Sequence, residues 1–148
     1  MARINKPYTS ALQYGLDGTI DYDTDTIKAA LVTSSYIFDA ADTVWADVSA
    51  NEVATGSGYT TGGVTVTGSV SSTAIDVTDP AWTALTKTFA YLVFYKSGTA
   101  NSVVNPLICC VVLDDDAGTP QDVVIAASDY TVPISSSGLI SLSVANSS

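Results

Sequence analysis

The chain has 148 residues, enough for one domain, and a formal net charge of −10 that arises from 15 acidic and 5 basic residues. A charge of this sign repels polyanions, which argues against nucleic acids and anionic membrane surfaces as partners. The chain contains no histidine, which excludes Ser-His-Asp and Cys-His catalysis, and no apolar run approaches the ~20 residues of a membrane span.

Charged residues make up only 14% of the chain, against about 25% in typical soluble domains. Thr, Ser, Asp and Gly take their place, and this mix favours strands and tight turns. A surface with few charges is also typical of proteins that are partly covered by a partner or by copies of themselves. We therefore expect a β-rich domain that takes part in protein–protein contacts.

Residues 1–7 are predicted to form an N-terminal arm ahead of a single domain over 8–148. Two of the five bases, Arg3 and Lys6, lie in this arm and make it a candidate interface with an acidic partner. A frayed tail is the simpler interpretation of the same residues. No apolar segment or cleavage site of a signal peptide follows, so synthesis in a cytosol is expected.

A short helix is predicted over 11–14, capped by Thr9 or Ser10 and ended near Gly15 or Gly18. Its apolar positions, Leu12 and Leu16, are four residues apart and so share one helical face.

An acidic alternation follows, in which Asp21, Asp23 and Asp25 form the D-x-D-x-D pattern that opens a calcium-binding EF-hand loop. The match then fails, because Thr26 stands where the loop needs Gly and Val32 where it needs Glu. The three aspartates are weak calcium candidates, and a solvated strand edge is the alternative. The loop at 114–116 is a weaker candidate still, since three aspartates before Ala-Gly more often make a solvated turn.

The middle of the chain alternates apolar runs with glycine-rich turns. Residues 27–32 are nearly all apolar and are predicted to form a buried strand. A single helical turn is expected at 42–48 with Asp42 as its cap, and glycines punctuate a turn at 56–63. Strands at 64–67 and 73–77 are predicted to flank a hairpin turn.

Residues 86–96 give the strongest strand signal, and residues 107–113 form a second strand with two apolar faces. The adjacent Cys109 and Cys110 are expected to point to opposite faces as buried thiols. Aromatic side chains gather around the first strand, and we interpret them as core in preference to a sugar-binding platform. These residues are Trp82, Phe89, Tyr91 and Tyr95.

Three further strands are predicted at 123–126, 130–134 and 139–144, with a hairpin turn at 135–138. Short strands joined by turns, with one or two short helical turns near the N-terminus, predict an all-β fold. We expect an antiparallel β-sandwich, and the choice between a jelly-roll and an immunoglobulin-like strand order stays open.

Paired carboxylates are the remaining route to catalysis, but Glu52 is the sole Glu and nothing marks two acids as facing each other. The glycine-rich turn lacks the Lys of a phosphate loop and the spacing of a dinucleotide fingerprint. We therefore expect neither an enzyme nor a cofactor.

Two motifs carry a resemblance to a known family: DTDTIKAALVTSSY at 23–36 and ANEVATGSGYTTGGV at 50–64. Together they resemble small structural proteins of tailed phages and prophages, and the resemblance continues more loosely through 79–96, 105–108 and the last strand from Gly138. The hairpin at 69–75 departs from the family pattern, because it is shorter and richer in serine.

The resemblance implies a non-enzymatic virion protein made in the host bacterial cytoplasm. Its expected role is a capsid cement or decoration protein that binds the outer face of the head and bridges capsomers. Its expected partners are the major capsid protein and copies of itself, as a dimer or trimer. A tail- or fibre-associated protein and a carbohydrate-binding adhesion module are the alternatives.

Overall fold

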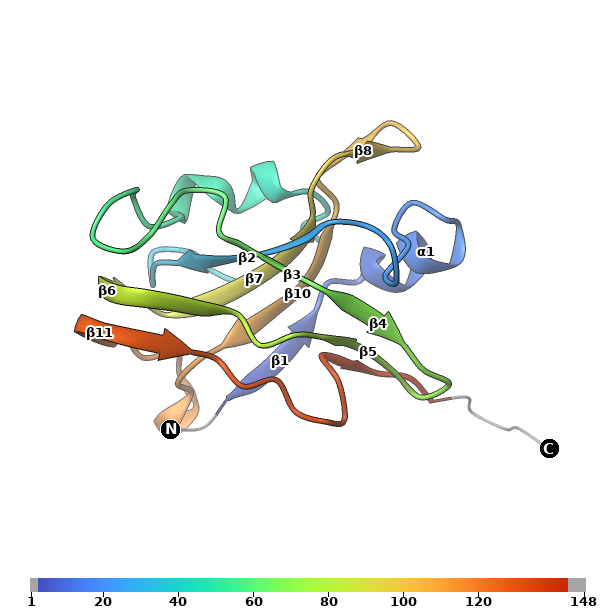
Figure 1. Cartoon of the computed structure of the whole chain (residues 1–148). Helices are drawn as coiled ribbons and strands as arrows, with labels where there is room; N and C mark the ends of the chain where they lie inside the picture. Colours follow the sequence, from blue (N-terminus) through green and yellow to red (C-terminus); the bar gives the residue numbers. More distant parts are fainter. Residues whose placement is uncertain (1–2, 144–148) are drawn as a thin grey trace.

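A computed structural model describes residues 3–143 of the protein. Its largest element is a five-stranded antiparallel sheet (Figure 1), which confirms the predicted all-β class. In sheet order its strands are β1 (Ile4–Pro7), β10 (Leu107–Val112), β7 (Tyr91–Lys96), β2 (Ile27–Val32) and β3 (Val64–Val66).

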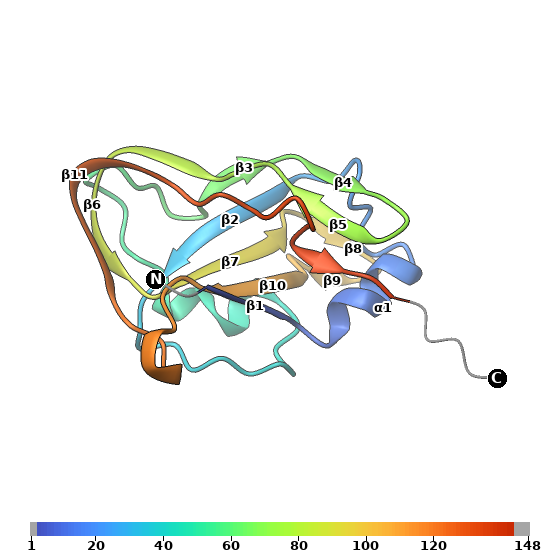
Figure 2. The ribbon, with the colours of Figure 1, turned by 90° about the horizontal axis from the view of Figure 1, so that it is seen from below.

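Two smaller sheets form a second layer over one face of the large sheet, as the view from below shows (Figure 2). One pairs β11 (Val123–Thr131) with β6 (Ala81–Phe89), and the other has the order β12 (Ile140–Ser141), β5 (Ala74–Val77), β4 (Gly68–Val70). The chain passes between layers at Thr67, which separates β3 from β4. The result is a β-sandwich-like arrangement, with a small hairpin of β8 (Thr99–Ala100) and β9 (Val103–Val104) projecting from it.

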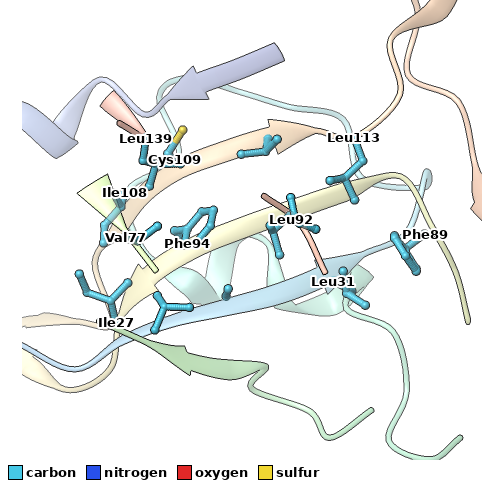
Figure 3. Packing of buried hydrophobic residues seen from close by; sticks show 14 of the residues in the cluster. Ile27, Leu31, Val77, Phe89, Leu92, Phe94, Ile108, Cys109, Leu113 and Leu139 are labelled. Atoms are coloured by element: carbon cyan, nitrogen blue, oxygen red, sulfur yellow. The ribbon is translucent and has the colours of Figure 1, made fainter. Parts of the chain in front are cut away.

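The main core lies between the two layers, where apolar side chains of the large sheet meet those of the second layer (Figure 3). Alternate residues of each central strand point into it, because side chains on a strand alternate between faces. From the large sheet come Ile27, Leu31, Leu92, Phe94 and Cys109, and from the second layer Val77, Leu85, Phe89 and Val123.

The other face of the large sheet is covered by the segment 36–53 instead of solvent. This segment holds two 3₁₀ turns, η1 (Trp45–Asp47) and η2 (Ser49–Asn51). The Trp45 ring stacks on Tyr95 of β7 with ring centroids 4.5 Å apart and planes 9° apart. Both faces of β7 are therefore buried, as predicted for a strand with two apolar faces.

Cys109 and Cys110 confirm the alternation along β10. Cys109 belongs to the core between the layers, and Cys110 to the core under the segment 36–53. Both are free thiols, and burial raises the pKa of each, that of Cys110 to about 12. Both thiols therefore stay protonated and pack as small apolar side chains.

Residues 86–96 were predicted to form one strand, and this was wrong. The chain breaks at Ala90, where its N–H donates to Val32 O and its carbonyl accepts from Leu113 N. Residues before the break belong to β6 in the second layer, and residues after it to β7 in the large sheet. Phe89 consequently shares a core with Leu92, whereas one continuous strand over 86–96 would place these two side chains on opposite faces.

Residues 4–7 are not an arm. Strand β1 pairs along its whole length with β10, from Ile4 opposite Val112 to Pro7 opposite Cys109. The polar side chains of Arg3, Asn5 and Lys6 gave no strand signal, because an edge strand pairs through its backbone and needs few apolar side chains.

The C-terminal strands also differ from the prediction. Residues 123–131 form one strand with register shifts, instead of ending at 126. The turn at 135–138 is present, since Gly138 N donates to Ser135 O, but it leads to β12, which pairs with β5 and not with β11. The last predicted strand is formed at 140–141, and its end at Val144 lies outside the described residues.

The predicted helix is confirmed as α1 (Ser10–Leu16), although Thr9 at its N-terminus makes no side-chain capping bond. The helical turn near Trp45 is confirmed in 3₁₀ form. Its cap was assigned to the wrong aspartate, because it is Asp47 whose carboxylate accepts the N–H groups of Thr43 and Val44.

Candidate interaction surface

Helix α1, the acidic turn at 17–25 and the β4–β5 hairpin meet at one end of the molecule (Figure 1). Between them lies an open hollow of about 350 Å³, which we call the α1 hollow. Its lining is mainly apolar and contains Ala11, Leu12, Gly15, Leu16, Gly18, Ile20, Asp21, Tyr22, Asp23, Val70, Ile75 and Leu142.

Three large apolar side chains of the α1 hollow are exposed to solvent. Leu16 is 81% exposed, Leu12 58% and Val70 47%. The two leucines share one face of α1, since they are four residues apart, and Val70 lines the same hollow from β4. Seven large apolar residues are exposed among those that the structure describes, so nearly half of them gather here. This clustering makes the α1 hollow a candidate interaction surface.

Asp21 and Asp23 form the polar rim of the α1 hollow. Asp21 Oδ1 accepts from Asp23 N at 3.1 Å, which closes a tight turn. Asp23 Oδ1 accepts from Val70 N at 2.8 Å and so ties this turn to β4. Within residues 3–143, no ion pair is formed by either carboxylate.

Asp25 points to a different partner. Its Oδ2 lies 2.8 Å from Lys96 Nζ and also accepts from Asp21 N at 2.7 Å. Partial burial by itself would raise the pKa of Asp25, but the hydrogen bonds from Lys96 and Asp21 and the Lys96 charge outweigh it and lower that pKa. Lys96 is 9% exposed and donates a second bond to Thr19 O at 3.0 Å.

The calcium candidates are therefore not brought together. Residues 21–25 form a turn instead of a strand, and one carboxylate oxygen each of Asp21, Asp23 and Asp25 accepts from a backbone N–H, with Lys96 as a further partner of Asp25. At the second candidate, 114–116, Asp114 Oδ1 accepts from Asp116 N in an Asx-type turn. No group of three or more acidic or cysteine residues suited to a metal ion occurs in the described part of the chain.

Arg3 and Lys6, the candidate interface of the predicted arm, lie on or beside β1 and make contacts within the domain. Arg3 Nη1 donates to Pro133 O at 3.2 Å, and Lys6 Nζ lies 5.3 Å from the centre of the Phe38 ring. Neither residue lines the α1 hollow.

The aromatic residues weighed as a sugar-binding platform are core residues. Trp82, Phe89, Tyr91 and Tyr95 are each at most 5% exposed, so their ring faces are unavailable to a sugar. This confirms the interpretation of these rings as core.

Glu52 accepts two hydrogen bonds within residues 50–64, the second of the two motifs that resemble the phage family. This role was not predicted from the sequence. Glu52 Oε1 accepts from Tyr59 OH at 2.7 Å and from Gly62 N at 2.6 Å. Tyr59 OH in turn accepts from Leu31 N on β2, and Tyr95 OH donates to Gly62 O. These bonds attach the 50–63 loop to β2 and β7. The feature of the sequence that could have predicted this role is that the only Glu of the chain lies beside a glycine-rich segment.

The α1 hollow was also missed as a site, although the spacing of Leu12 and Leu16 on a predicted helix was noted. The hollow is a candidate site because both leucines are exposed to solvent. Their exposure depends on how α1 packs against the rest of the domain, which the spacing of the leucines does not reveal.

No protein-family model, curated protein or solved structure matches the chain. Among residues 3–143, no helix has the length and apolar character needed to cross a membrane.

Proposed function

We propose that this protein is a virion structural protein of a tailed phage, acting as a capsid cement or decoration protein on the outer surface of the head. The observation that carries the proposal is the α1 hollow, an exposed apolar surface with an acidic rim on a β-domain. The resemblance of residues 23–36 and 50–64 to phage structural proteins supports the same role.

The architecture suits such a role physically. A cement protein bridges capsomers under internal pressure, so it needs a domain that does not deform. Here the large sheet is covered on both faces, and the 50–63 loop is held by the carboxylate of Glu52. Binding in many copies multiplies modest contacts into tight association. The partners are the major capsid protein and copies of this chain, as a dimer or trimer on a symmetry axis.

Co-sedimentation tests the proposal. Mature, DNA-free heads that lack this protein are mixed with the purified chain, and bound copies are counted per major capsid subunit. We expect saturable binding at a simple ratio and a rise in the temperature at which heads break. Purified tails provide the second arm of the experiment. Binding to tails alone would replace the head assignment by the tail alternative, and binding to neither would overturn a virion role.

A further inference from the structure

We propose that the α1 hollow is the surface that contacts the head, and that its occupant is a segment of the major capsid protein with apolar side chains next to a Lys or Arg. This inference rests on the proposed function and adds the contact surface and the chemistry of the partner segment.

The apolar part of the partner follows from the walls of the hollow. Leu12 and Leu16 present one helical face to the hollow, and Val70 of β4 also lines it. Deeper in the hollow, Ile20 and Ile75 are at most 5% exposed and form an apolar floor. An apolar side chain that enters between these walls loses its contact with water together with the exposed leucines, and this supplies the main drive for association.

The basic residue of the partner follows from the rim. Asp21 and Asp23 line the hollow, and no Lys or Arg lines it. A Lys or Arg beside the apolar anchor would meet both carboxylates, which adds orientation and speeds the encounter.

The same charges argue against a second copy as the occupant. In a two-fold contact, the same patch of both copies meets itself. Such a contact would bring Asp21 and Asp23 against their own equivalents on two chains that each carry a formal net charge of −10. A capsid segment with a base has no such cost.

The hollow is held open by internal hydrogen bonds. Tyr22 OH donates to Ala11 O at 2.9 Å, and Ile20 N donates to Tyr14 O at 2.9 Å, so α1 is tied to the turn that follows it. The bond from Val70 N to Asp23 ties the same turn to β4. A preformed surface avoids the cost of ordering on binding.

The first test removes the apolar contact. The double variant Leu12→Gln/Leu16→Gln keeps good helix formers on α1, so the fold should persist, as circular dichroism would verify. We expect its affinity for heads to fall at least about tenfold in the co-sedimentation assay. Ile37→Gln is the matched control, because Ile37 is 85% exposed and lies outside the hollow; its binding should equal that of the unaltered chain.

The second test removes the rim charge and keeps the turn. Asn retains the Oδ1 acceptor, so Asp21→Asn/Asp23→Asn preserves the bonds to the Asp23 and Val70 N–H groups. We expect weaker binding and a smaller loss of affinity between low and high salt. Asp39→Asn is the control, since Asp39 accepts from Ala41 N in the same kind of turn.

The outcomes separate the two proposals. If the unaltered chain binds heads and the leucine variant binds equally well, the α1 hollow is not the contact surface, whereas the cement role is retained. If the unaltered chain binds no heads, the cement role and the contact surface are both wrong. Retained salt dependence in the Asn double variant would overturn the basic partner segment. A dimer of the unaltered chain that the leucine variant loses would assign the hollow to a second copy and overturn the proposal.

Discussion

Asp25 was a calcium candidate in the sequence, but in the structure it forms an ion pair with Lys96. In sequence, Asp25 is the third member of an acidic alternation. In the structure it is the partner of a lysine that is 9% exposed and 71 positions away. A buried lysine without a counter-charge is costly, so this pair anchors the 17–25 turn to β7 and supports one wall of the α1 hollow.

We predict that Asp25→Asn lowers the free energy of unfolding by about 2 kcal/mol at neutral pH, because it leaves Lys96 without its counter-charge. The folded-state pKa of Asp25 is lowered from its ordinary value of 3.8. Its contribution is therefore complete above that value and is lost as the pH falls below it through the folded-state pKa. Urea denaturation from pH 7 to pH 2 should show the difference between the two proteins shrinking toward zero.

Asp39→Asn is the control for this measurement, because Asp39 is exposed and forms no ion pair among the described residues. Its unfolding free energy should stay within about 0.5 kcal/mol of the unaltered protein. A difference for Asp25→Asn that stayed constant down to pH 2 would contradict the ionic origin of the effect.

At the scale of elements, the conformation of the 50–63 loop and its packing on β2 show why glycine is required at positions 56 and 63. Gly63 has a φ of +81°, and a Cβ there would overlap the carbonyl of Ala29 on β2. Gly56 has a φ of +119° with nothing within 4 Å of the same position. Both glycines are needed for their backbone conformation, but only Gly63 is also needed for the close approach of the loop to the sheet.

We predict that Gly63→Ala destabilises the protein by about 3 kcal/mol, since it adds a clash with β2 to the backbone strain. Gly56→Ala is the control and should cost about 1 kcal/mol, from strain alone. Urea denaturation of both variants measures the difference. Equal losses would mean that the loop yields without displacing β2, and would contradict a tight attachment of the loop to that strand.

At the scale of the whole molecule, β1 is part of the closure of the sandwich. It forms the edge of the large sheet, and Asn5 Nδ2 donates to Leu139 O at 3.0 Å, which links that edge to the second layer. Arg3 makes a similar link to Pro133 O. The N-terminal segment that looked like a separate arm therefore holds the two layers together at this edge.

Deletion of residues 1–7 should lower the melting temperature by roughly 10 °C, because it removes a paired strand and uncovers the edge of β10. A dispensable arm would leave the melting temperature unchanged, and thermal denaturation distinguishes the two. Arg3→Ser/Lys6→Ser is the control, since it leaves the backbone pairing of β1 in place and should shift the melting temperature by only a few degrees. The same double variant, and not the deletion, can test whether these bases contact the head.

The order of residues along the chain was enough to predict the all-β class, the burial of the strands at 27–32 and 107–112, and the opposite orientation of the two cysteines. These features follow from local periodicity, because the side chains of an extended chain alternate between faces wherever it packs. The break at Ala90, the pairing of β1 and the exposure of Leu12 and Leu16 became visible only in the folded chain. Each of these depends on which distant segment lies alongside, and the spacing of residues along the chain carries no record of that neighbour.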